Sequence, residues 1–526
     1  MTSNTASLPL DLIVRGATVF DGTGSPGRRA DVGVRKGVIT AVGAIGPESP
    51  AARSVRADGL ALCPGFIDIH SHADIALLRE PASPAKALQG VTTEVFSNCG
   101  LGFAPANDVS LEMQRAACGG LFGEPGECGW SWRSVADLLA LYEERGVGAN
   151  VAYLAPHGAV RTAVLGAAAR PASADERRRM ADLVREAREQ GAWGISTGPW
   201  YAPMRFADRA EFVELARPAG FFATHLRDYG EGLMDAIAET ASIAREAGAR
   251  AQVSHLQLGS PSLHGRASDV LEALEAEHRA GAEIGADAYP YGAGATLVHA
   301  LLPSWATAGE PRELDARLAD AALCVRMEAD LRASGRDLSA LTVLGAGAEP
   351  LAPLEGRTFG EGAREVGTSV EGLVCLLARE SRLRATFIAP HTPEEDLVEL
   401  LRWPHLCIGS DGLHLPDRTH PRLWGTFARV LARYARRTST LTLEEALRKM
   451  TSAPAGLLGI RDRGVLAPGM AADLTLFDPA LVQDHATYGE PDRPASGVRC
   501  VWVNGVAVVE EGRPTGRLPG RVLRPS

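Results

Sequence analysis

Eight short apolar segments alternate with long helical segments along most of the chain, and this alternation constrains the fold more than any other feature. Short apolar runs bounded by turn residues predict strands, and the Ala-, Leu-, Arg- and Glu-rich stretches between them predict helices. The eight predicted strands end at residues 72, 99, 157, 198, 225, 255, 291 and 411. Strands that alternate with helices form parallel sheets, so eight such units predict an α/β fold, the (β/α)8 TIM-like barrel.

Further strands are predicted at both ends of the chain. β-Branched runs broken by Gly and Asp turns occupy residues 12–20, 30–35, 38–42, 472–477 and 498–509. We expect a small β-sandwich domain built from residues 1–62 and 458–526, beside a barrel of residues 63–457. Two separate β-appendages would produce the same pattern.

The connection between the seventh and eighth strands is too long for a loop. Structureless loops of this length are uncommon in compact domains, and residues 370–378 carry a helical pattern. The sequence therefore predicts an inserted subdomain at about 296–403. It could cap a substrate pocket on the catalytic face, or it could be a structural buttress.

The sequence predicts the first residues of two helices in the second half of the chain. Thr392 precedes Pro393 and a Glu-rich turn, and Thr442 precedes Leu443–Glu444–Glu445. Threonine is a favoured N-cap residue and proline suits the first helical position. Both threonines are therefore predicted to cap helices.

The composition argues against several classes of partner. The 526 residues carry a net charge of −10 and contain no basic run, which argues against nucleic acid and anionic membranes. No apolar run approaches the roughly 20 residues that span a bilayer, and no secretory signal is evident. The eight cysteines have no disulfide-framework spacing, which favours a reducing cytoplasm. We expect a small molecule as the partner.

Residues that bind metals gather where the predicted strands end. His70 and His72 alternate with Ser71 along a strand, so both imidazoles point to the same side. Because barrel active sites lie at the carboxyl ends of the strands, more donors should converge there. The candidate ligands are His70, His72, Cys99, His225, His255 and Asp411. Their N, S and O atoms suit zinc, and a Cys99 thiolate could bridge two ions. Alternatively, Cys99 is a buried apolar side chain and Asp411 a helix N-cap.

At these residues the sequence resembles the amidohydrolase superfamily and, within it, the D-aminoacylase (N-acyl-D-amino-acid deacylase) family. The resemblance runs nearly end to end. The histidine pair alone is a weak motif, whereas the histidines, Cys99 and Asp411 together are a specific one. The motifs that carry it lie at residues 64–72, 97–100, 196–201, 224–228, 254–255, 287–291, 409–412, 420–422 and 464–473.

The resemblance also indicates how metals would be held. Many relatives bridge two ions with a carboxylated lysine at the end of strand four, but the three lysines here, Lys36, Lys86 and Lys449, are not near it. A cysteine-bridged centre is therefore expected. The resemblance implies one tightly bound Zn²⁺ held by Cys99, His225 and His255. It also implies a second position, often weaker or empty, at His70, His72 and Asp411, which shares Cys99.

The resemblance further implies amide hydrolysis. Asp411 would take a proton from water and pass it to the departing amine. The family points to Arg422, Tyr289 and Tyr201 for the substrate's α-carboxylate, although either tyrosine could instead be a packing residue at the rim. Family members active on acyl-D-amino acids usually carry Lys where this chain has Gln257.

Three functions therefore stay open. The first is a zinc-dependent deacylase of N-acyl-D-amino acids or related dipeptides ending in a D-residue. The second is a hydrolase of cyclic or neutral amides on the same scaffold. The third, a catalytically silent binding protein, is disfavoured by the intact ligand set.

Overall fold

The structure is a computed structural model that describes residues 9–415 and 418–525. Its centre is a barrel whose strands are short and almost entirely buried, because most of their residues are apolar, β-branched or small. The barrel strands are β6 (Phe66–Asp68), β8 (Val91–Phe96), β9 (Asn150–Tyr153), β10 (Ala155–Pro156), β11 (Ile195–Thr197), β12 (Phe221–Thr224), β13 (Arg250–Val253), β14 (Ile284–Ala288) and β18 (Leu406–Ile408).

All neighbouring barrel strands are parallel. The order is β6-β8-β9 in one sheet and β10-β11-β12-β13-β14-β18 in another, and β9 and β10 are two parts of the third predicted strand. The ring closes where β7 (Ser71–His72) pairs in parallel with β19 (Gly412–Leu413). The predicted α/β barrel of eight parallel strands is thus confirmed.

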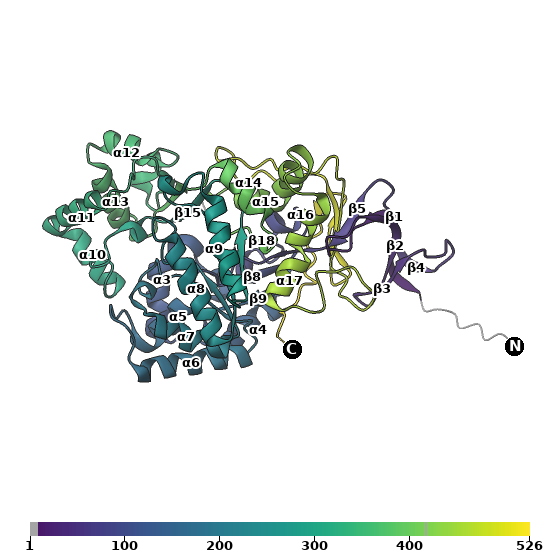
Figure 1. Cartoon of the computed structure of the whole chain (residues 1–526), viewed down its shortest axis with the longest axis horizontal. Coiled ribbons are helices and arrows are strands. Elements are labelled where there is room, and N and C mark those ends of the chain that lie inside the picture. The colour runs from purple at the N-terminus through teal and green to yellow at the C-terminus, as the bar shows by residue number, and fades with distance from the viewer. Residues whose placement is uncertain (1–8, 416–417, 526) are drawn as a thin grey trace.

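Helices lie around the barrel and cover its outer face (Figure 1). In α8 the buried residues Ile237, Ala241 and Ala244 recur at helical spacing and share a core with Ala251 and Val253 of β13. The helices are α1 (Ala76–Arg79), α2 (Pro84–Ala87), α3 (Asp108–Phe122), α4 (Val135–Arg145), α5 (His157–Leu165), α6 (Ala174–Glu189), α7 (Arg209–Ala219), α8 (Leu233–Ala247), α9 (Ala267–Arg279), α14 (Glu394–Arg402), α15 (Arg422–Arg429), α16 (Leu443–Met450) and α17 (Ser452–Leu458).

The two chain ends share one nine-stranded sheet, ordered β23-β22-β21-β20-β5-β1-β2-β3 with β4 paired to β1. Its centre is the antiparallel pairing of β5 with β20. The strands are β1 (Leu10–Val19), β2 (Arg28–Arg35), β3 (Val38–Gly43), β4 (Ala51–Arg56), β5 (Ala61–Pro64), β20 (Leu474–Phe477), β21 (Val498–Val503), β22 (Val506–Glu510) and β23 (Arg513–Pro514). The division into domains at residues 62 and 458 stays a prediction.

The segment between β14 and β18 contains its own small sheet, ordered β15-β17-β16, and its own apolar core. Its helices α10–α13 lie at the end of the molecule opposite β1–β5 (Figure 1). The elements are β15 (Ala293–Leu297), the 3-10 helix η4 (Val298–Leu301), α10 (Pro311–Ala319), α11 (Ala321–Ala333), β16 (Thr342–Gly345), α12 (Phe359–Val366), α13 (Val370–Glu380) and β17 (Thr386–Pro390).

One of the two predicted caps is correct. The Thr442 hydroxyl accepts from the Glu445 amide at 3.2 Å and caps α16. Thr392 does not cap α14, because Pro393 is the N-cap residue and the Thr392 hydroxyl instead accepts from the Leu258 amide at 3.0 Å. In residues 9–415 and 418–525, no helix is long and apolar enough to cross a membrane.

Candidate metal centre

All six predicted ligands lie at one end of the barrel, in or just after a strand. Burial is nearly complete for each of them, from 0% exposed for His70 to 7% for His225. Cys99, His255 and Asp411 have φ angles of 58°, 36° and 49°, in the left-handed region that residues with side chains seldom adopt. Such strained backbone is concentrated at functional sites.

Two overlapping groups of donor atoms result. Cys99 Sγ lies 3.4 Å from His70 Nε2 and 3.4 Å from His255 Nε2. Asp411 Oδ1 lies 3.1 Å from His72 Nε2 and 3.5 Å from His70 Nε2. In each group, one ligand atom per residue lies within 4.8 Å of the others. His70 belongs to both groups. That Cys99 is shared by two metal ions stays a prediction.

His225 lies beside these groups. Its Nδ1 is 3.0 Å from His255 Nε2, and its ring is stacked at 5.7 Å on Trp200. Among the described residues it belongs to neither group of three donors. A tight site formed by Cys99, His225 and His255 therefore stays a prediction.

Asp287 is a buried carboxylate near the end of β14 that contacts the ring of one histidine and the backbone of another. Its two oxygens each lie 3.1 Å from His70 Nδ1, and one accepts from the His255 amide at 3.0 Å. It also accepts from Gln252 Nε2 at 2.5 Å. Carboxylates of this kind fix the ring orientation and raise the basicity of ligating histidines. Sequence reasoning assigned Asp287 no role, although its place at a strand end was a usable signal.

Lys86 forms the centre of a buried ionic network among the residues that flank the ligands. Its ammonium group pairs with Asp68, lies 3.5 Å from Glu94 and donates to Ser410 Oγ at 2.5 Å. Asp68 in turn accepts from the Ser410 amide at 2.8 Å. Ser410 directly precedes Asp411, so the network fixes the backbone that carries this ligand.

The charge state of the site suits metal binding except at His70. Burial alone would lower the pKa of His70, but Asp287, Cys99 and Asp411 raise it well above its usual value, so a metal ion would have to displace a proton there. Burial lowers the pKa of His72 and lowers that of His255 to about 4, which leaves both imidazoles neutral. Burial alone would raise the pKa of Asp411, but Arg422 and the histidines hold it well below its usual value. Burial raises the pKa of Cys99, so a metal ion would have to displace the thiol proton.

Arg422 is 1% exposed and lies directly against the donor groups. Its Nη1 is 2.8 Å from Asp411 Oδ2, and its guanidinium lies 4.8 Å from the centre of the Tyr289 ring. Its Nη2 donates to the carbonyl oxygen of Ala295, in β15, at 3.3 Å. The predicted substrate arginine is therefore at the site, but it already has an acidic neighbour.

The two candidate tyrosines are also at the site and both contact the inserted segment. The Tyr289 hydroxyl lies 3.1 Å from His391 Nε2 and donates to Gln257 Oε1 at 3.3 Å. The Tyr201 hydroxyl lies 2.9 Å from Thr296 Oγ1. His391 and Thr296 were not foreseen, because the sequence does not show which part of the insertion returns to the barrel.

Comparison with known proteins identifies the family. A model of the amidohydrolase family matches residues 54–322 and 378–509. The chain belongs to the amidohydrolase family. It is 37% identical to D-aminoacylase from Alcaligenes xylosoxydans xylosoxydans, over 99% of each chain.

Two solved amidohydrolase structures have the same fold over nearly the whole chain. A D-aminoacylase reported with a binuclear metal centre has a TM-score of 0.84 and 36% identity, covering 98% of this chain and 100% of its own. An N-acyl-D-glutamate deacylase from Bordetella bronchiseptica, complexed with zinc and a phosphonate mimic of the tetrahedral intermediate, has a TM-score of 0.81 and 32% identity. It covers 98% of this chain and 100% of its own.

The donor set of this amidohydrolase fits a zinc-like ion. Imidazole, thiolate and carboxylate are its usual protein ligands, and each of the two groups supplies three donors. Asp411 is ionised and the His72 and His255 imidazoles are neutral, so these three are ready to bind a metal ion. Cys99 and His70, whose pKa values are raised, must each lose a proton.

Proposed function

We propose that the protein is a zinc-dependent amide hydrolase that removes the acyl group from N-acyl-D-amino acids or cleaves related dipeptides ending in a D-residue. The observation that carries this proposal is the pair of overlapping donor groups, centred on His70, beside the buried Arg422–Tyr289 pair. The similarity to D-aminoacylase over the whole chain supports the same reaction class.

The residues that would hold zinc are His70, His72, Cys99, His225, His255 and Asp411. We infer one tight site and a second, weaker position. When bound, zinc supplies Lewis-acid chemistry that acidifies water and polarises the amide carbonyl. Asp287 would keep His70 in its orientation, because its carboxylate contacts Nδ1 of the ring while Nε2 faces Cys99.

Asp411 would act as the proton carrier. Its low pKa keeps it ionised and able to accept a proton from water. It would then pass that proton to the nitrogen of the departing amine. Arg422, 2.8 Å away, would hold the carboxylate in place during both transfers.

The α-carboxylate of the substrate would bind to Arg422 and the Tyr289 hydroxyl, with Tyr201 forming the wall beside His225. Arginine suits this role because its guanidinium presents several donors in one plane. Two contacts fix the position of the Arg422 guanidinium: the Tyr289 ring beneath it and the carbonyl oxygen of Ala295.

A second candidate, a hydrolase of cyclic or neutral amides, is favoured by two observations. Arg422 already lies beside Asp411, which satisfies part of its charge. Gln257, which touches the Tyr289 hydroxyl, offers no second cation for a carboxylate.

The deciding experiment measures zinc content and product release together. We expect the zinc-loaded protein to release acyl groups from N-acetyl-D-amino acids faster than from their L-enantiomers or from their amidated counterparts. Faster turnover of hydantoins or amides than of any N-acyl-D-amino acid would favour the second candidate. Turnover unchanged after complete removal of zinc by chelation would refute a metal-dependent hydrolase.

A further inference from the structure

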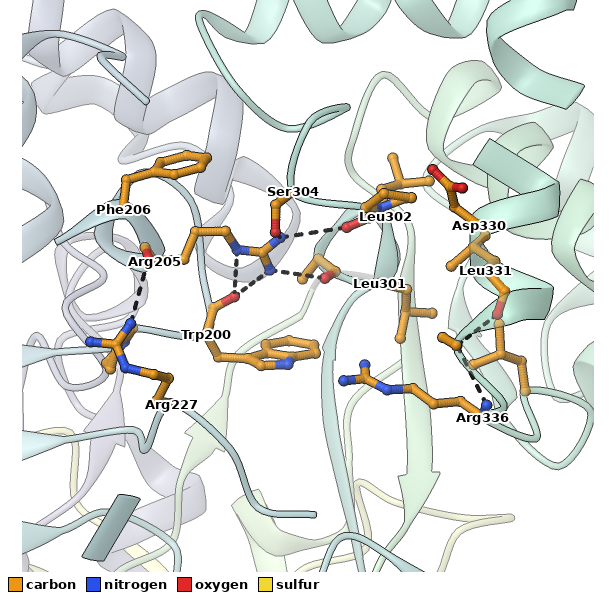
Figure 2. A pocket seen from close by; sticks show the side chains of 15 residues that line it. Trp200, Arg205, Phe206, Arg227, Leu301, Leu302, Ser304, Asp330, Leu331 and Arg336 are labelled. Carbon is orange, nitrogen blue, oxygen red and sulfur yellow. Dashed lines mark hydrogen bonds between the residues drawn. The ribbon is translucent and has the colours of Figure 1, made fainter. Parts of the chain in front are cut away.

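A cavity of about 450 Å³ lies between the barrel rim and the inserted segment. This volume falls within the range of small-molecule pockets. The rim side comes from the chain after β11, with Trp200 and Arg205, and the opposite side comes from η4, α11 and the turn after α11, with Arg336 (Figure 2). We call it the rim pocket.

The rim pocket adjoins the candidate metal centre through one side chain. The Trp200 ring lines the pocket and is stacked on the His225 ring at 5.7 Å, with an angle of 28° between the planes. The next residue, Tyr201, contacts Thr296 of β15, and the chain continues from β15 into η4, which lines the pocket. Arg422 and Tyr289 do not line the pocket. A substrate whose α-carboxylate lies at Arg422 would therefore have a different end near Trp200.

The rim pocket contains two arginines that no carboxylate neutralises. Arg205 has no acidic partner among the described residues, and its guanidinium donates to backbone oxygens and hydroxyls of Trp200, Ala300, Leu302, Ser304 and Thr307. Burial, with a contribution from Arg336, lowers its pKa to about 10. The Arg336 guanidinium extends toward the Trp200 ring (Figure 2), and in the described part of the chain it has no ion pair.

The other charged groups of the pocket already have partners. Arg227 is paired with Glu239 at 3.1 Å. Asp330 accepts from Trp305 Nε1 at 2.6 Å, so its carboxylate is held toward that indole. The Asp330 carboxylate keeps its charge, because an indole N–H is neutral, and the Arg205 guanidinium already donates to backbone oxygens. Arg336 is thus the cation of the pocket that is left for a ligand.

We propose that the rim pocket binds an anionic group that the substrate carries away from its α-carboxylate. The group is either the acidic side chain of the D-residue or the free carboxylate of a dicarboxylic acyl group. This inference rests on the proposed deacylase function. Trp200 packs against the carbon chain that leads to the anion, and Arg336 pairs with the anion at the pocket mouth.

The test compares Arg336→Gln with Arg364→Gln, which removes another exposed arginine of the inserted segment. Three substrates are assayed with the zinc-loaded proteins: N-acetyl-D-glutamate, N-succinyl-D-leucine and the neutral N-acetyl-D-leucine. We expect Arg336→Gln to lower kcat/KM for an anionic substrate about fivefold, which corresponds to the largest contribution usual for an exposed ion pair. The kcat/KM for the neutral substrate should stay unchanged. Arg336→Glu should reduce the value for the anionic substrate further, and Arg364→Gln should change nothing.

The substrates distinguish the two sources of the anion. A loss confined to N-acetyl-D-glutamate assigns the pocket to the side chain, and a loss confined to N-succinyl-D-leucine assigns it to the acyl group. The unaltered protein turns over at least one of the three substrates if the deacylase function is correct. If Arg336→Gln and the unaltered protein then have equal kcat/KM values on both anionic substrates, the role of the rim pocket in anion binding is overturned and the deacylase function is kept. Absence of turnover of all three by the unaltered protein would overturn the deacylase function and this inference with it.

Discussion

His70 Nδ1 lies 3.1 Å from both carboxylate oxygens of Asp287, while the opposite ring nitrogen faces Cys99 at 3.4 Å. The carboxylate thus fixes the direction of a side chain that belongs to both donor groups. Asp287→Asn should weaken zinc binding roughly 10- to 100-fold, because the amide is a poorer acceptor for the imidazole N–H. Competition with a zinc chelator measures this, and Asp484→Asn, whose carboxylate pairs with Arg429 and not with a histidine, is the control. Unchanged zinc affinity would limit Asp287 to a packing role.

Cys99→Ala should lose most of the bound zinc and all turnover while the fold is kept. The side chain is small and 2% exposed, so truncation leaves a modest void. Because burial raises the pKa of the thiol, zinc affinity of the unaltered protein should increase with pH. Zinc analysis and circular dichroism check this, with Cys63→Ala, in β5, as a matched control. Stoichiometric zinc in Cys99→Ala would show that the thiol is no ligand.

Asp411→Asn should retain substrate binding but lower kcat by roughly 10²- to 10⁴-fold, because an amide cannot carry the proton. The change keeps the size of the side chain and its left-handed backbone, which Asn tolerates. Steady-state kinetics with zinc-loaded protein check this. A kcat close to that of the unaltered enzyme would show that Asp411 serves only structure.

Arg422→Met should lower kcat/KM for carboxylated substrates by roughly 30-fold or more, since a lost charged contact costs about 2–5 kcal/mol. Because Arg422 also lies against Asp411, some loss should be common to every substrate. The informative quantity is the additional loss for an acid over its own amide. Equal losses for both would remove Arg422 from α-carboxylate binding and favour the neutral-amide candidate.

Lys86→Met should destabilise the protein by roughly 3–5 kcal/mol, because Asp68 and Glu94 would remain buried without their cation. Denaturant unfolding followed by circular dichroism measures the change. Lys36→Met, at an exposed turn, is the control and should have little effect. A loss no larger than that of Lys36→Met would mean that the network contributes little.

The barrel could be predicted because its strands are buried runs that the sequence displays locally. The convergence of the candidate ligands could be predicted for a related reason, since a parallel barrel brings every strand end to the same face. The break between β9 and β10 left no comparable signal, and Thr392 was misassigned because its hydroxyl binds the Leu258 amide, far away in sequence.

Apart from Asp287, whose place at a strand end is visible in the sequence, the groups that support the ligands could not be predicted. Lys86 and His391 gain their roles only from the side chains that the fold brings face to face. Nothing in the sequence near Lys86 indicates that its ammonium group reaches Ser410, which lies 324 residues later in the chain. The same holds for the rim pocket, which depends on where the inserted segment packs.

The antiparallel pairing of β5 with β20 has a consequence for synthesis. β5 leaves the ribosome long before β20, and at ordinary rates of translation the interval lasts roughly tens of seconds. Throughout that time the edge of β5 that pairs with β20 has no partner in the nascent chain. We expect newly made chains to depend on a holding chaperone until the last strands emerge, and expression at lower temperature to raise the yield of folded protein.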